Sequence, residues 1–218
     1  MNNRLTNSKE TPEDLIHLFK SYPQLKECFT DIYKAYLVLL DCFISENKLL
    51  VCGNGGSAAD SEHIVGELMK SFKKKRAIKR EFAENYIAIN KENPPEYLEG
   101  AVTAISLVSQ MALLTAFSND KTSRGYFAQQ VYGYGRENDV LLCISTSGNS
   151  LNVVDAAKVA KAKNMRVISF TGCKDSKLSV LSDVCVQAPE AETYKIQELH
   201  LPIYHAICAA IESELFSE

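Results

Sequence analysis

From Lys48 onward, the chain alternates short apolar runs with Gly- or Ser-containing turns and amphipathic segments. Strands that are apolar along their whole length are typical of a sheet covered by helices on both faces. The alternation therefore predicts an α/β fold, a doubly wound parallel sheet flanked by helices. The expected strands are Leu49–Cys52, Val102–Leu107, Leu141–Ile144, Val167–Thr171 and Val184–Gln187. The expected helices are about Ser57–Phe72, Gln110–Phe117, Phe127–Tyr134, Leu151–Lys163 and Thr193–Leu215.

The remaining segments complete the expected organisation. Apolar residues at helical spacing before Lys48 predict one or two N-terminal helices, interrupted near Pro23. The charged stretch Lys70–Pro95 is expected to be an extended connection or lid, and its basic run is interpreted as solvated surface. No repeat or linker divides the chain. We expect a single domain over 1–218, comprising a flexible 1–12, an N-terminal helical segment 13–47 and an α/β core 48–216.

Composition excludes several functional classes. The chain is 46% apolar and 23% charged, which is ordinary for a globular protein. Its 24 basic and 27 acidic side chains give a net charge of −3, so we expect no nucleic acid partner. The seven cysteines are widely spaced and form no CxxC pair, which indicates reduced thiols and a cytoplasmic protein. No signal peptide or run of roughly 18 apolar residues is present, so we expect no membrane partner.

A glycine-rich segment follows the first expected strand and precedes a helix. Residues 52–57 read CGNGGS. Glycine lets the backbone approach a ligand closely, and a helix N-terminus offers free N–H groups and the positive end of its dipole. We expect Asn54, Gly55, Gly56 and Ser57 to form a phosphate site. The segment matches neither GxGxxG nor a loop ending in GK[ST], so no ATP or NAD cofactor is expected.

A second loop of this kind follows the third expected strand. It reads STSGNS and places the hydroxyls of Ser145, Thr146, Ser147 and Ser150 beside another helix start. Either loop alone is also typical of a turn with a helix cap. Because ligands of open α/β sheets bind at the carboxyl ends of the strands, the two loops together favour one phosphate pocket.

Two expected helices carry a concentration of titratable and amide side chains. His63 and Glu67 are four residues apart, so they share a helix face. Gln197 and His205 are eight apart and share a face if the helix continues through Pro202. A carboxylate and a histidine suit proton transfer, and the set His63, Glu67, Gln197 and His205 equally suits a divalent ion such as Zn²⁺. A purely structural role is the third interpretation.

These motifs, in this order, resemble the sugar isomerase (SIS) domain of phosphoheptose isomerases, also called sedoheptulose-7-phosphate isomerases. The resemblance covers roughly residues 13–216. It rests on the two loops, on Asp60, His63 and Glu67, on the pair Asn119-Asp120, and on Ile196–His200 with His205.

The resemblance implies a flavodoxin-like sheet and a homotetramer with active sites at subunit interfaces. It also implies isomerisation of sedoheptulose 7-phosphate to a heptose 7-phosphate through an enediol, with no organic cofactor. Glu67 and His205 would be the catalytic residues, and Zn²⁺ would bind His63, Glu67, Gln197 and His205. The implied substrate-binding residues are Asn54, Gly55, Gly56, Ser57, Asn119, Asp120, Ser145, Thr146, Ser147, Ser150 and Gln197.

The chain also departs from the family pattern. Ser71-Phe72 stand where members commonly have Arg-Tyr, Lys121–Arg124 replace the usual glycine and aromatic residues, and the connection 73–99 is longer. Two alternative functions follow. One is an isomerase for a different phosphosugar, and the other is a non-catalytic SIS module, of the replication-initiator-associating type, that acts through a protein partner.

Overall fold

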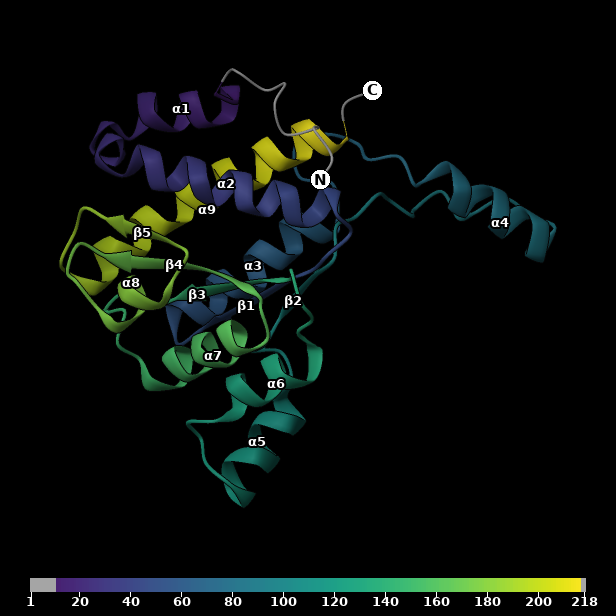
Figure 1. Cartoon of the computed structure of the whole chain (residues 1–218). Helices are drawn as coiled ribbons and strands as arrows, with labels where there is room; N and C mark the ends of the chain where they lie inside the picture. Colours follow the sequence, from purple (N-terminus) through teal and green to yellow (C-terminus); the bar gives the residue numbers. More distant parts are fainter. Residues whose placement is uncertain (1–10, 217–218) are drawn as a thin grey trace.

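The computed structural model describes residues 11–216. Residues 1–10, which belong to the segment 1–12 expected to be flexible, lie outside that range. The fold has three layers, with a parallel sheet between two layers of helices (Figure 1). All five expected strands are confirmed, with boundaries shifted by a few residues. They are β1 (Leu49–Gly53), β2 (Ala104–Ser106), β3 (Val140–Ile144), β4 (Arg166–Gly172) and β5 (Val184–Ala188).

The strand order β2-β1-β3-β4-β5 confirms the flavodoxin-like topology. Every neighbouring pair is parallel, and Gly53 at the end of β1 lies opposite Ile144 at the end of β3. Strand β2 pairs with one edge of β1, and β3 pairs with its other edge. The glycine loop and the serine loop therefore leave the sheet next to each other, at its topological switch point.

Each face of the sheet is covered by its own helices because alternate strand residues point in opposite directions. Leu49 and Val51 face a core formed with the N-terminal helices, α3 and α9, whereas Leu50 and Cys52 face α6, α7 and α8. The helices of the first face are α1 (Glu13–Ser21), the 3-10 helix η1 (Pro23–Cys28), α2 (Phe29–Ile44), α3 (Gly56–Met69) and α9 (Thr193–Leu215). Those of the second face are α6 (Tyr126–Tyr134), α7 (Leu151–Ala162) and α8 (Lys177–Leu181), with α5 (Met111–Asp120) against α6.

Helix α9 runs unbroken through Pro202, as the shared face of Gln197 and His205 requires. It packs against α3, and the two helices run in the same direction, because Gln197 lies at Gly56 and His205 lies at His63. Neither α9 nor any other helix between residues 11 and 216 is both long and apolar enough to cross a membrane.

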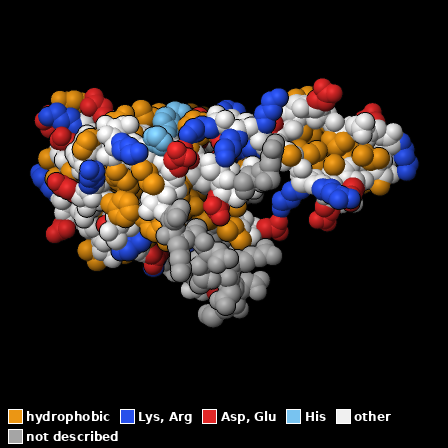
Figure 2. Space-filling model, turned by 90° about the horizontal axis from the view of Figure 1, so that it is seen from above, with side chains coloured by type: hydrophobic (Ala, Val, Ile, Leu, Met, Phe, Trp, Pro, Cys, Tyr) orange, Lys and Arg blue, Asp and Glu red, His pale blue; other side chains and the backbone are white. Residues whose placement is uncertain are grey.

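The stretch Lys70–Pro95 is not an extended connection throughout, since residues Arg80–Asn90 form an additional helix, α4. This helix has no buried residue and projects from the body as an arm (Figure 1). Its apolar side chains are open to solvent, with Phe82 46%, Ile87 44% and Ile89 78% exposed. Figure 2 shows hydrophobic side chains gathered along the arm.

The basic run of this stretch is not wholly solvated surface either, because Arg76 is buried. Its guanidinium pairs with Glu212 of α9 at 2.7 Å and donates to the carbonyls of Leu68 and Glu67, at the end of α3. Glu212 also accepts from the backbone N–H groups of residues 72, 73 and 74. Although burial raises the pKa of a carboxyl, these hydrogen bonds and the guanidinium hold the pKa of Glu212 below its ordinary value.

We expect Glu212→Ala to lower the free energy of unfolding by about 3–5 kcal/mol, because it leaves the Arg76 charge buried without a partner. Urea denaturation measures the change. Glu84→Ala, which removes the partner of Arg80 in an exposed pair on α4, is the control and should have little effect. A loss no larger than the control's would contradict the structural role of the Arg76–Glu212 pair.

Candidate functional site

The glycine loop joins β1 to α3 through a conformation that requires glycine. Gly55 has φ +58° and is the residue before α3, and no side chain caps this helix start. Ser57 is buried in the first turn, whereas Asn54, Gly55 and Gly56 are exposed. The exposed loop therefore leads into a helix start that has no side-chain cap, and a helix start of this kind can bind anions.

The serine loop has the same character at the start of α7. Ser150 precedes the helix without capping it by a side-chain hydrogen bond, and the Ser145 hydroxyl donates to the Ser150 hydroxyl at 3.1 Å. Gly148 has φ +61°, and a Cβ there would lie 2.1 Å from Ser176 Oγ, so only glycine fits. The loop is thus held close to α8 while Ser147 remains exposed.

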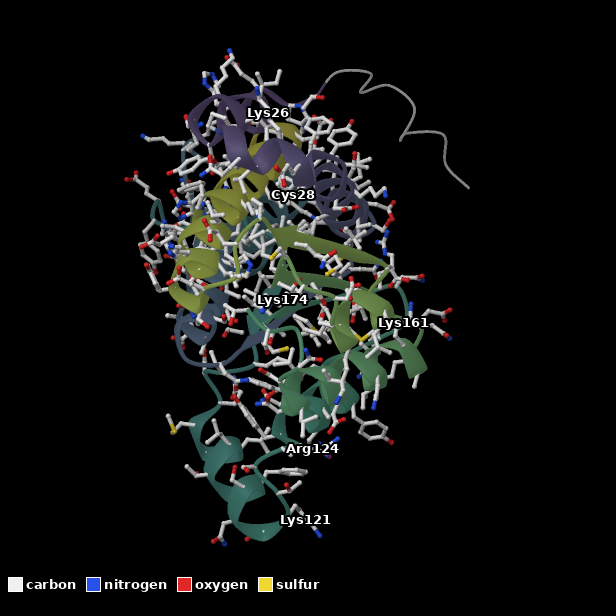
Figure 3. The ribbon with its side chains drawn as sticks, turned by 90° about the vertical axis from the view of Figure 1, so that its left-hand side faces the viewer. Lys26, Cys28, Lys121, Arg124, Lys161 and Lys174 are labelled. Atoms are coloured by element: carbon white, nitrogen blue, oxygen red, sulfur yellow. The ribbon has the colours of Figure 1, made fainter. Side chains whose placement is uncertain are left out.

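The structure brings the two loops together, as the sequence predicted. The side chains of Asn54 and Asn152 exchange two hydrogen bonds, at 3.0 and 2.9 Å, between the glycine loop and the first turn of α7. A cavity of about 240 Å³ opens beside Thr146 and Ser147 and is also lined by Lys174, Asp175 and Glu190. Lys174 follows the carboxyl end of β4 and is labelled in Figure 3.

The predicted titratable residues converge where α3 packs against α9. His63 Nε2 lies 3.2 Å from Glu67 Oε1 and 3.4 Å from His205 Nε2. The carboxylate of Glu67 is mostly shielded, with 12% of its side chain exposed. Two imidazoles and one carboxylate from two helices therefore face one point, which we call the His63–Glu67–His205 cluster.

Burial and charge tune this cluster. Burial lowers the pKa of His205 below its ordinary value, and neighbouring His63 lowers it further, while Glu67 opposes the shift. Glu67 Oε2 is buried without a hydrogen-bond partner, and the Lys70 amino group lies 3.7 Å from it. The Phe72 ring packs against His205, with 5.6 Å between ring centroids. The lowered pKa favours the neutral form of the His205 imidazole, which can both donate and accept a proton.

Gln197 lies apart from the cluster. A Cβ at Gly56 would be 2.6 Å from Gln197 Nε2, so this amide packs against the glycine loop instead. In the described part of the chain, no group of three or more His, Cys, Asp or Glu side chains is arranged so that it could hold a metal ion. The structure thus assembles three of the four residues expected to bind metal and places the fourth at the expected phosphate site.

Asn119 and Asp120 lie at the end of α5, far from the rest of the site within one chain. Figures 1 and 3 place α5, with Lys121 after it, at the tip of the molecule away from Lys174. Both residues are exposed, and their side chains hydrogen-bond to each other at 2.9 Å. Within residues 11–216, no hydrogen bond joins them to the two loops or to the cluster.

Sequence reasoning missed residues that support the cluster. The hydroxyl of Tyr204 lies within hydrogen-bond distance of Asp60 and His63, and Phe72 packs on His205. The sequence signal for Tyr204 is its position next to His205, and Phe72 was noted only as a departure from the family pattern. His200, in contrast, is fully buried with Nε2 3.1 Å from the carbonyl oxygen of Thr171, so it is a structural histidine.

Comparison with known families agrees with this geometry. Residues 99–213 match a family model described as the SIS domain, and residues 22–120 match a second model with the same description. The parallel sheet with its two loops at the switch point is accordingly that of a SIS-domain protein.

Individual relatives narrow the assignment. The phosphoheptose isomerase of Neisseria meningitidis serogroup C is 36% identical over 82% of this chain and 80% of its own. A solved phosphoheptose isomerase from Neisseria gonorrhoeae has a TM-score of 0.69 at 32% identity, covering 91% of this chain and 96% of that one. One from Francisella tularensis has a TM-score of 0.71 at 29% identity, covering 92% and 97%. The chain belongs to the SIS domain family, in its phosphoheptose isomerase branch.

His200 predicts a pH dependence of stability. Burial lowers its pKa from 6.5 to about 4, so between these values the unfolded chain binds more protons than the folded one. The free energy of unfolding is unaffected by this group above pH 6.5. It falls as the pH is lowered towards 4, by about 3 kcal/mol in total, since each unit of pKa difference corresponds to about 1.36 kcal/mol.

Urea denaturation of the parent chain and of His200→Gln across this range tests the effect. The variant should lose stability less steeply with falling pH, whereas His17→Gln, a change at an exposed histidine, should follow the parent. Equal slopes for the parent and His200→Gln would contradict the prediction.

Proposed function

We propose that this protein is an aldose–ketose isomerase that converts sedoheptulose 7-phosphate to a heptose 7-phosphate with its aldehyde at C1. The observation that supports the reaction class is that Glu67, on the helix that begins at the glycine loop, and His205, on α9, both lie beside His63 Nε2. The choice of sugar is supported by the relatives named phosphoheptose isomerase. All seven cysteines are free thiols, which supports activity in the reducing cytoplasm.

The two loops would hold the phosphate. The uncapped starts of α3 and α7 offer backbone N–H groups and the positive ends of two helix dipoles. The hydroxyls of Ser57, Ser145, Thr146, Ser147 and Ser150 would add hydrogen bonds, together with Asn54 and Gln197 at the glycine loop. Binding energy from the phosphate, remote from the reacting carbons, would then orient the sugar chain towards the cluster.

The cluster would move the protons. Aldose–ketose exchange removes a proton from the carbon beside the carbonyl, passes through an enediol and returns a proton to the neighbouring carbon. Glu67, whose Oε2 has no hydrogen-bond partner, is the proposed base at carbon. His205, whose neutral form is favoured by burial, is the proposed group that transfers a proton at the adjacent oxygen. The roles exchange with the direction of reaction.

The donor types of the cluster are those that Zn²⁺ favours, imidazole nitrogen and carboxylate oxygen, although the side chains are not arranged around a metal position in this structure. His63, Glu67 and His205 would hold the ion, and the orphaned Oε2 of Glu67 is a further free donor. Gln197 is the fourth residue expected from the sequence. A bound ion would act as a Lewis acid, stabilising negative charge that develops on the sugar oxygen.

We further propose a homotetramer with active sites at subunit interfaces. Helix α4 extends from the body with its apolar side chains uncovered, and the apolar helix α5 has no buried residue either. Contiguous exposed apolar surface of this kind is typical of interaction sites. In such an assembly Asn119 and Asp120, which lie far from the loops of their own chain, would approach the site of a neighbour.

Turnover of sedoheptulose 7-phosphate by the purified protein, followed by NMR, tests the reaction. We expect Glu67→Gln and His205→Ala each to reduce kcat by about 10²–10⁴-fold, because each removes a proton-transfer group. Turnover with added Zn²⁺ and after chelation measures the contribution of the metal.

Glu62→Gln, a change at an exposed carboxylate on the same helix, is the control and should retain turnover. Loss of folding or assembly in the Glu67 or His205 variants would count against a catalytic role. No conversion by the parent chain, with phosphosugar binding intact, would favour the other phosphosugars or the non-catalytic module.

The assembly is tested at α4. We expect Ile89→Asp to reduce the mass measured by analytical ultracentrifugation, since it places a charge on the apolar face of the arm. Val180→Asp changes an apolar residue of α8 that is 85% exposed and should leave the mass unchanged. A tetramer that tolerates Ile89→Asp would exclude the arm from the interface.

A further inference from the structure

A buried tyrosine of α9 contacts α3 on the side of His63 that faces away from Glu67. Tyr204 precedes His205 on α9 and is only 2% exposed. Its hydroxyl lies 3.2 Å from Asp60 Oδ1 and 3.0 Å from His63 Nδ1, both on α3. Its ring meets the rings of His63 and His205 edge-on, with 5.5 and 4.8 Å between centroids.

The chemistry of these three groups fixes the direction of their hydrogen bonds. A carboxylate only accepts, so the single hydroxyl proton of Tyr204 is donated to Asp60. The hydroxyl oxygen is then left to accept, and the atom opposite it, His63 Nδ1, must be the donor. A neutral imidazole with its proton on Nδ1 has a lone pair on Nε2.

That lone pair points into the cluster. His63 Nε2 is the atom that lies 3.2 Å from Glu67 Oε1 and 3.4 Å from His205 Nε2. We propose that Tyr204, held by Asp60, is a positioning residue that keeps the His63 proton on Nδ1 and presents Nε2 as a lone pair to Glu67 and His205. This inference rests on the proposed function, because that function gives the His63–Glu67–His205 cluster its role in proton transfer.

The role has a defined consequence for the site. With its lone pair inward, His63 can accept a hydrogen bond from His205 or ligate a cation. With its proton inward it could do neither and would donate to Glu67, occupying the proposed base. Partners behind a ligating histidine commonly contribute about 10- to 100-fold to metal affinity. The hydroxyl of Tyr204 is thus expected to matter although it faces away from the cluster.

The test is the tautomer of His63, measured by ¹⁵N NMR on histidine-labelled, metal-free and substrate-free protein at mildly alkaline pH. The chain has four histidines, and His63→Gln assigns the signal. In the parent the proton should be on Nδ1. Tyr204→Phe keeps the ring and removes the hydroxyl, so part of the population should move its proton to Nε2. Zn²⁺ affinity, measured by competition with a chelator, should fall by about 10- to 100-fold.

Tyr36→Phe is the matched control. Tyr36 is also buried, at 1% exposure, but its hydroxyl has no hydrogen-bond partner among the described residues. This variant should leave both the tautomer and the zinc affinity unchanged. If Tyr204→Phe fails to fold, Asp60→Ala replaces it. Without the carboxylate, the hydroxyl is free to donate to His63 Nδ1, and the proton should move to Nε2.

Two results would overturn the proposal. One is a parent His63 that carries its proton on Nε2, and the other is a tautomer unchanged by loss of the Tyr204 hydroxyl or the Asp60 carboxylate. Because the measurement needs no substrate, it tests the positioning role of Tyr204 independently of the proposed reaction. A tautomer that shifts as expected in a chain that converts no sedoheptulose 7-phosphate would refute the proposed reaction and leave the positioning role standing.

Discussion

The buried pair of Arg76 and Glu212 holds together the two helices on which the candidate site depends. Glu212 belongs to α9, the helix of His205, and Arg76 donates to the last carbonyls of α3, the helix of His63 and Glu67. One of those carbonyls is that of Glu67 itself. Forming a buried ion pair adds little to the free energy of unfolding, but removing one partner costs several kcal/mol. The pair therefore favours the one packing of the helices in which both partners meet. Here the pair fixes the position of α9 along the axis of α3.

Helix α3 serves both halves of the proposed chemistry. Its first turn forms part of the glycine loop, and Glu67 lies ten residues after Ser57, about 15 Å further along the axis. The sheet places the serine loop beside the first turn, because β1 and β3 are neighbours at the switch point. Binding and proton transfer are therefore separated along one rigid element, and α9 follows that element over its whole length.

The sequence predicted the sheet well because its strands are continuous apolar runs, and it predicted the cluster because helical spacing places His63 beside Glu67. It missed α4, whose apolar residues Phe82, Ile87 and Ile89 stand in a charged segment that never packs on the body. The short helix α8 was missed as well. Gln197 shares a face with His205, but eight residues separate them by about 12 Å of helix, so it reaches the glycine loop instead.

Contacts between distant segments were beyond sequence reasoning. A run of basic residues does not reveal that Arg76 has a partner 136 positions away, nor does the spacing of α9 reveal that Tyr204 meets Asp60 across 144 positions. Both contacts depend on how α3 and α9 pack, which follows from the whole core. The position of Asp120 far from the loops was equally hidden, since the resemblance supplied a role for it and no location.

The base of the arm has a consequence of its own. The N–H of Gly100 donates to the carbonyl of Arg76 at 3.0 Å, so the chain leaves and re-enters the body at nearly the same place. Lys79 also pairs with Glu46, and Glu99 accepts hydrogen bonds from Ser71, so the segment is tied to the body at its base. The length of chain beyond these contacts contributes to the stability of the body through loop-closure entropy, about 0.6 kcal/mol for each doubling. The fold of the three-layer body therefore tolerates a longer or shorter arm, whereas the proposed assembly, which uses the apolar face of α4, would not.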